Sequence, residues 1–63
     1  MQSIIEKIAK KILATKKIAM NIDNIERVTF LEGNDFTCYI AQQGNWKFLI
    51  FYYEDGTMNI LHL

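Results

Sequence analysis

Apolar residues recur at helical spacing in the first third of the chain. At about 100° per residue, one side of residues 4–20 carries isoleucines and an alanine: Ile4, Ile5, Ile8, Ile12 and Ala19. The opposite side is mostly charged: Glu6, Lys7, Lys10, Ala14 and Lys17. The pattern predicts an amphipathic helix that docks through its isoleucines. Ser3 and Glu6 fit a capping box at its start, and Asn21 is a residue that can end it.

From residue 25 onward, short apolar stretches alternate with turn residues. Strands are expected over residues 25–32, 36–42, 46–53 and 57–63, joined by turns at residues 33–35, 43–45 and 54–56. Because all three connections are tight, consecutive strands should pair as an antiparallel meander. The predicted fold is therefore α+β: an N-terminal amphipathic helix packed on one face of a three- to four-stranded antiparallel β-meander. Residues 1–63 are expected to form a single small domain.

Side-chain alternation divides the expected sheet into two faces. If the first two turns have three-residue loops, the core face carries Val28, Phe30, Phe36, Cys38, Ile40, Phe48, Ile50 and Tyr52. The other face then carries Arg27, Thr29, Leu31, Thr37, Tyr39, Lys47, Leu49, Phe51 and Tyr53. Which side Met58 and Ile60 face depends on the third turn, and stays open.

The third strand is apolar on both faces, since residues 48–53 contain no charged or small polar side chain. One helix covers only one face of a sheet, so the other face needs a second layer. We expect a second copy to supply it, sheet against sheet or edge strand against edge strand, which makes a homodimer. The alternative is that the twisted sheet, its last strand or residues 20–22 shield this face. The interaction residues predicted are Tyr39, Leu49, Phe51, Tyr53 and Trp46.

Composition agrees with a folded domain, because 51% of the 63 residues are apolar and 22% are charged. The longest apolar run is six residues, too short to cross a bilayer. No hydrophobic signal segment is visible, and Cys38 is the lone cysteine, so the expected location is the reducing cytoplasm. Domains this small that lack disulfides often gain stability by oligomerisation.

No arrangement of reactive residues predicts catalysis. His62 is next to the C-terminus, where it is expected to fray, and Ser3 is a helix cap. Cys38 is expected on the core face, where burial makes a thiol inert, although a dyad of Cys38 with His62 is conceivable. Glu54 and Asp55 are explained by turn chemistry. The chain contains no spacing typical of a metal site or a phosphate loop, so we expect no enzyme, metal or cofactor.

Charge is segregated although the whole chain is neutral. Residues 1–20 hold five lysines and one acid, while residues 21–63 hold two cations and six acids. A basic amphipathic helix can bind membranes, but lysine is also the ordinary solvent-side residue of a helix, and no membrane partner is expected. Nucleic acid is the alternative partner, bound by stacking on sheet aromatics. Its predicted contacts are Arg27, Lys47, Lys10 and Lys17.

Two family resemblances bear on function. The order of one helix and three strands resembles the front of a double-stranded-RNA-binding domain, but the closing helix with its basic start is absent. In size and layout the chain resembles the small accessory and inhibitor proteins of phages and mobile elements, including anti-defence proteins. That resemblance implies a non-enzymatic protein-interaction module that binds, and by binding inhibits, another protein.

Overall fold

The computed structural model of the chain describes residues 3–63. Residues 1–2 of the expected domain lie outside the described part. A helix, α1 (Ile4–Lys16), is followed by two short 3-10 helices, η1 (Ile22–Asn24) and η2 (Thr29–Leu31), on either side of the first strand, β1 (Ile25–Arg27). The remaining strands are β2 (Phe36–Gln43), β3 (Trp46–Tyr53) and β4 (Met58–His62).

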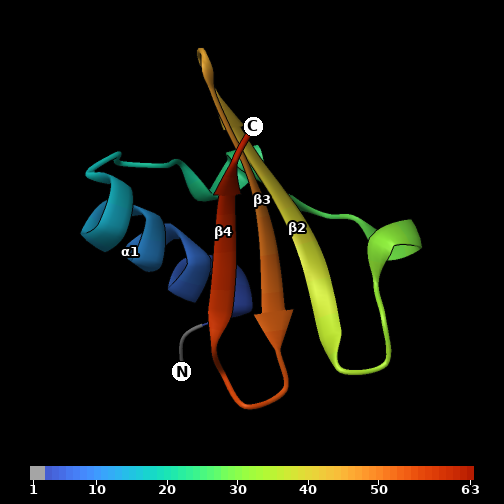
Figure 1. The fold of residues 1–63 in the computed structure, drawn as a ribbon. Helices are drawn as coiled ribbons and strands as arrows, with labels where there is room; N and C mark the ends of the chain where they lie inside the picture. The colour runs from blue at the N-terminus through green and yellow to red at the C-terminus, as the bar shows by residue number, and fades with distance from the viewer. Residues whose placement is uncertain (1–2) are drawn as a thin grey trace.

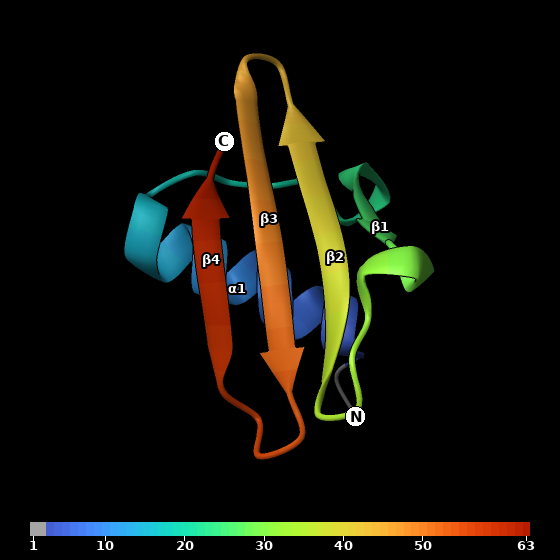
Figure 2. The same cartoon turned by 45° about the vertical axis from the view of Figure 1, so that its right-hand side comes forward.

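The four strands form one antiparallel sheet in the order β1-β2-β3-β4, and α1 crosses a single face of it (Figure 1). This confirms the predicted α+β meander. Figure 2 shows the opposite face in front, with α1 behind the strands. We call these the helix-facing side and the outer face of the sheet. No helix covers the outer face within residues 3–63.

The start of α1 follows from its predicted cap. Ser3 is the N-cap residue, and its Oγ accepts the backbone N–H of Glu6 at 3.2 Å. The helix ends earlier than expected, because Lys17 adopts the left-handed conformation, with φ 62°, and donates its backbone N–H to Leu13. Asn21 caps η1 instead, where its side chain accepts the N–H of Asp23 at 3.0 Å.

The expected first strand over residues 25–32 is only three residues long. The Val28 N–H still donates to the Cys38 carbonyl at 2.8 Å, but the chain then turns away as η2. An ion pair between Arg27 and Glu32 closes this turn. Phe30, which was expected in the core, is consequently 85% exposed, and that prediction is wrong.

The hairpin between β2 and β3 changes which side chains reach the core. Gln43 lies opposite Trp46, so the loop is the two residues Gly44-Asn45 and not three. Gly44 has φ +60°, as the first loop residue of a type II′ turn requires. The shorter loop moves every β2 side chain to the face opposite the one expected. Tyr39 therefore lies on the helix-facing side.

One core forms between α1 and the helix-facing side of the sheet. The helix supplies Ile8 and Ile12, both fully buried, as predicted. The sheet supplies side chains from three strands: Ile25, Tyr39, Ala41, Phe48 and Ile50. Met20 joins this core from the segment that follows α1, so the Met20 side chain does not shield the outer face. The third turn places Met58 and Ile60 on the helix-facing side, which settles the facing that the sequence left open.

Candidate interaction surface

The outer face carries an apolar surface that spans three neighbouring strands. Ile40, Leu49 and Leu61 lie directly opposite one another on β2, β3 and β4 and form a row across the sheet. Phe51 and Tyr53 extend this row along β3, and Phe36 lies opposite Tyr53 on β2. We call these six residues the outer-face patch. All of them are partly or substantially exposed, and Leu61 reaches 42%.

Aromatic contacts join three rings at one end of the patch. The Phe36 ring meets the Phe51 ring edge to face, with ring centroids 5.5 Å apart, and lies 5.9 Å from the Tyr53 ring. Cys38 is opposite Phe51 on the same face and is fully buried. The patch is therefore an ordered apolar surface, with a buried thiol within it.

Three of the five predicted interaction residues belong to the outer face. Leu49, Phe51 and Tyr53 point outward from β3, as expected. Tyr39 does not, because it is 5% exposed and packs in the core. Trp46 is also on the other side, since it lies opposite Gln43 and alternates with Lys47. The structure corrects the placement of Tyr39 and Trp46.

Sequence reasoning missed three members of the patch. Phe36 and Ile40 were assigned to the core face, and Leu61 was left unassigned. For Phe36 and Ile40 the signal was the length of the turn at Gly44, because a two-residue loop aligns Ile40 with Leu49, whereas the facing of Leu61 depended on the third turn. That signal was present in the sequence, since Gly in the first loop position favours a two-residue hairpin.

Trp46 forms a separate aromatic cluster near the tip of the β2–β3 hairpin. Its ring stacks on Phe48 with centroids 6.2 Å apart, and it lies 5.3 Å from the His62 ring. His62 belongs to β4, and the N–H of Leu63 donates to the Lys47 carbonyl at 2.8 Å. His62 is thus part of a paired strand in this structure.

The structure separates Cys38 from His62. Cys38 is on the outer face, whereas His62 lies opposite Phe48 on the helix-facing side. The sheet lies between the two side chains, so they do not form a catalytic dyad. Burial also raises the pKa of the Cys38 thiol, which disfavours the nucleophilic thiolate. Within residues 3–63, no cluster of three His, Cys, Asp or Glu residues could hold a metal ion.

The four cations predicted to contact nucleic acid are not gathered on one surface. Arg27 is on the helix-facing side of β1 and donates two hydrogen bonds to Glu32, at 2.7 and 3.0 Å. Lys47 points outward from β3. Lys10 belongs to α1, behind the sheet, and Lys17 caps that helix.

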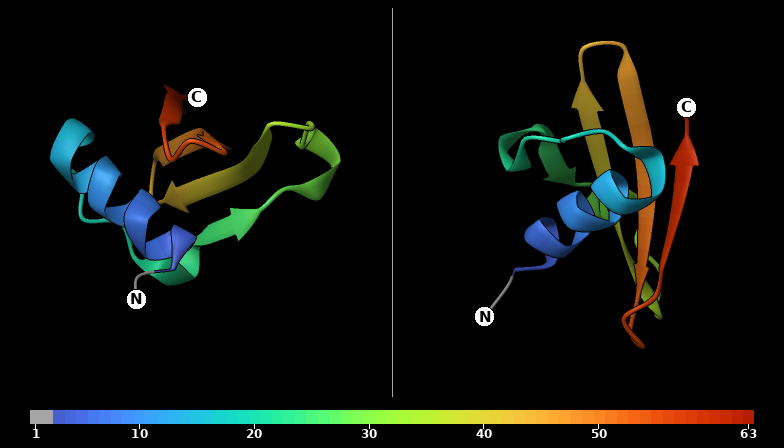
Figure 3. Two further views of the ribbon diagram at one scale, coloured as in Figure 1. Left: turned by 90° about the horizontal axis from the view of Figure 1, so that it is seen from below. Right: turned by 90° about the vertical axis from the view of Figure 1, so that its left-hand side faces the viewer.

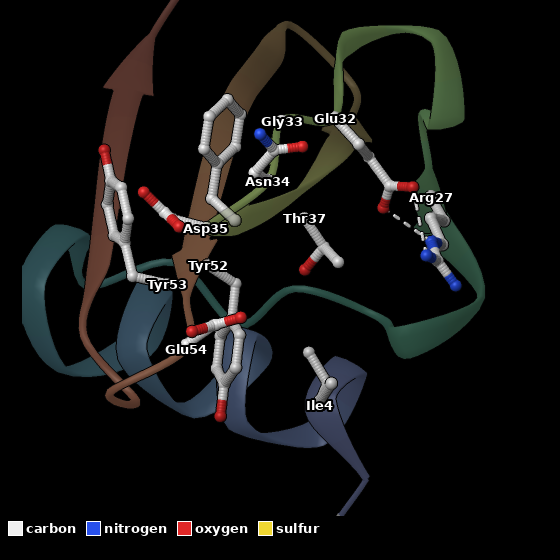
Figure 4. Close-up of a pocket in the computed structure, with 11 residues that line it drawn as sticks. Ile4, Arg27, Glu32, Gly33, Asn34, Asp35, Thr37, Tyr52, Tyr53 and Glu54 are labelled. Carbon is white, nitrogen blue, oxygen red and sulfur yellow. Dashed lines mark hydrogen bonds and ion pairs between the residues drawn. The ribbon is translucent and has the colours of Figure 1, made fainter.

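A cleft of about 300 Å³ opens where β2 begins and β3 ends (Figure 4). Ile4 and Tyr52 line one side and the Arg27–Glu32 pair lines another. Thr37 points into this space, and its buried Oγ1 has no hydrogen-bond partner among residues 3–63.

The Arg27–Glu32 ion pair lines this cleft together with the carboxylates of Asp35 and Glu54. The guanidinium hydrogen bonds lower the pKa of the Glu32 carboxyl below its ordinary value of 4.5. Glu32 is therefore ionised at neutral pH, although its side chain is only 17% exposed. The pair ties η2 to β1 and so fixes the loop that leads into β2.

No helix in residues 3–63 has the length and apolar character needed to span a membrane. Comparisons with protein-family models, curated proteins and solved structures found no match to this chain.

Proposed function

We propose that the protein is a non-enzymatic interaction module that self-associates through the outer-face patch and acts by binding another protein. The observation that carries this proposal is the row Ile40–Leu49–Leu61, which continues across three strands on the uncovered side of the sheet. A contiguous apolar surface on a small domain is typical of a protein interface.

A second copy is the occupant that best suits the patch. A two-fold dimer brings the same surface together from both subunits, so the surface must not repel itself. The flanks of the patch carry opposite charges: Glu26 lies opposite Ile40 on β1, and Lys47 is on β3 beside Leu49. Face-to-face packing of two sheets would bury the six patch residues in the centre of an interface.

The test is the solution mass of the protein over a dilution series, measured for the wild type and two patch variants. Phe51→Asp and Leu61→Asp each place a charge in the proposed interface and should give a monomer at concentrations where the wild type is a dimer. Phe30→Asp is the matched control, because Phe30 is 85% exposed and lies outside the patch. A wild-type monomer at every concentration, or equal dimerisation of all three variants, would reject the proposal.

The salt dependence of binding distinguishes this proposal from nucleic-acid binding. An apolar interface should respond little to added salt, whereas binding to phosphates weakens steeply. Retardation of labelled RNA or DNA at about 0.15 M salt would favour the nucleic-acid alternative, for which the dispersed positions of Arg27, Lys47, Lys10 and Lys17 give no support.

A further inference from the structure

The free edge of β4 differs from the other edge of the sheet. β1 has only three residues and is bounded by η1 and η2, so it offers little room for another strand. β4 has five residues, and its edge away from β3 pairs with no other strand among residues 3–63. Met58–His62 contains no proline, lysine, aspartate or glutamate, which are residues that proteins use to prevent pairing at an edge.

The hydrogen bonds of β4 show which backbone groups remain free. The N–H of Leu63 donates to Lys47, and the N–H of Tyr53 donates to Thr57. Hydrogen-bonded pairs alternate in an antiparallel ladder, so the odd-numbered residues of β4 direct their backbone groups toward β3. Met58, Ile60 and His62 therefore direct their N–H and C=O groups outward, and these groups could pair with an added strand.

A basic groove runs beside this edge on the helix-facing side. Lys11, Thr15 and Lys16 of α1 line it together with Met58 and Ile60, and its volume is about 180 Å³. Figure 3 shows the C-terminal end of α1 beside β4. The only acidic residue of α1 is Glu6, in its first turn. A strand added to β4 would thus place every second side chain against lysines.

We propose that the β4 edge binds an extended acidic segment of a partner protein by β-strand addition. The segment would run antiparallel to β4 and pair with the free backbone groups of Met58, Ile60 and His62. Its acidic side chains would face Lys11 and Lys16, and the intervening apolar ones would lie beside Leu61 on the outer face.

Charge favours such a segment over a second copy. Two-fold pairing of β4 with itself would bring Lys11 and Lys16 of both copies to the same side of the joined sheet, where like charges repel. β4 itself has no acidic side chain to offset them. The inference rests on the proposed function only in that the partner is a protein, because it uses the β4 edge and the lysines of α1, and shares only Leu61 with the outer-face patch.

The probe is an acetylated and amidated octapeptide in which glutamate alternates with valine. It should bind the full chain and shift the backbone amide resonances of Met58, Ile60 and His62, and these amides should exchange more slowly with solvent. A matched peptide with lysine in place of glutamate should bind at least about tenfold more weakly. N-methylation of alternate peptide residues should abolish binding, because it removes the donors that β4 carbonyls need.

Variants of α1 test the charge requirement. The double variant Lys11→Glu/Lys16→Glu should weaken acidic peptide binding by about tenfold. Lys7→Glu/Lys10→Glu is the matched control, since neither of these residues lines the groove, and it should lower affinity far less. Equal effects of the two double variants, equal binding of both peptides, or shifts confined to the outer-face patch would overturn the proposal.

Each of the two proposals can be rejected independently of the other. The variant Phe51→Asp, whose solution mass tests the outer-face patch, should still bind the acidic peptide. Loss of self-association in Lys11→Glu/Lys16→Glu would instead assign the β4 edge to a second copy and overturn the acidic-segment proposal.

Discussion

Gln43 accepts the backbone N–H of Asn21 through its Oε1, at 2.8 Å. The same oxygen accepts the side-chain amide of Asn24 at 3.1 Å, and the Gln43 Nε2 donates to the Ala19 carbonyl at 2.9 Å. One side chain at the end of β2 therefore binds three residues of the segment that carries the chain from α1 to β1. This segment has no strand partner of its own, so Gln43, together with the buried side chain of Met20, holds it in place.

Gln43→Ala should lower the free energy of unfolding by about 1.5–4.5 kcal/mol, because three hydrogen bonds are lost and each contributes about 0.5–1.5 kcal/mol. Urea denaturation followed by circular dichroism measures this change. Gln42→Ala is the control, since Gln42 is exposed and points to the outer face. Its effect should stay within about 0.5 kcal/mol, and equal losses in the two variants would contradict the role given to Gln43.

The elements with local signals could be predicted from the sequence. The helix begins where Ser3 and Glu6 indicated, and β3 has the predicted bounds, because an apolar run between two turns is a local pattern. Gln43 could not be predicted in the same way. Its partners lie 19 to 24 positions earlier in the chain, and only the folded arrangement brings them together.

The β2 members of the patch depended on the length of the turn at Gly44, whereas Leu61 depended on the third turn. A loop of three residues at Gly44 would place Tyr39 outward and Ile40 in the core, while the observed loop of two does the reverse. The β3 members Leu49 and Phe51 did not depend on this loop and were predicted correctly. Sequence patterns thus identified the apolar outer side of β3, but not the side chains that β2 and β4 add to it.

The buried contacts of α1 should contribute more to stability than its exposed apolar residues. Ile8→Ala should lower the free energy of unfolding by about 2–4 kcal/mol, because it opens a cavity at a fully buried site. Leu13→Ala removes a side chain of the same size from the same helix, but Leu13 is 50% exposed, so its cost should stay below about 1 kcal/mol. Thermal and urea unfolding both report this difference. A similar cost at the two positions would contradict the observed docking of α1.

Stability should depend on pH through Glu32. Its folded pKa is lower than the ordinary value because Arg27 donates hydrogen bonds to it, so ionised Glu32 stabilises the fold above the unfolded-state pKa. This contribution is lost as the pH falls through the folded pKa. The difference in urea midpoint between the wild type and Glu32→Gln should therefore be largest near neutral pH and shrink in acid. When Arg27 is also replaced, by Arg27→Gln, the substitution Glu32→Gln should no longer change the pH dependence of the urea midpoint. If the pH dependence still changed, a group other than the Arg27–Glu32 pair would be its cause.

Gly33 should be needed for the order of the outer-face patch. A Cβ at this position would lie 2.9 Å from Cζ of Phe36, and even closer to another carbon of that ring. Gly33→Ala should displace the ring from Phe51 and cost about 1–3 kcal/mol by overpacking. The loss of ring-current shifts on Phe51 in proton NMR spectra measures the displacement. The same substitution should cost much less in a Phe36→Ala background, and an unchanged cost would show that the ring is not the cause.

Glycine should have opposite effects at the last residue of α1 and at the residue that follows it. Lys17 is left-handed, which costs a side-chain-bearing residue about 1–2 kcal/mol, so Lys17→Gly should raise stability by about 0.5–1 kcal/mol. Lys16 is still helical, and Lys16→Gly should lower stability by up to about 1 kcal/mol, because glycine is a poor helix former. Both variants remove one lysine, so a change in net charge cannot explain a difference in sign. If both lower the urea midpoint, α1 does not end in a left-handed residue at position 17.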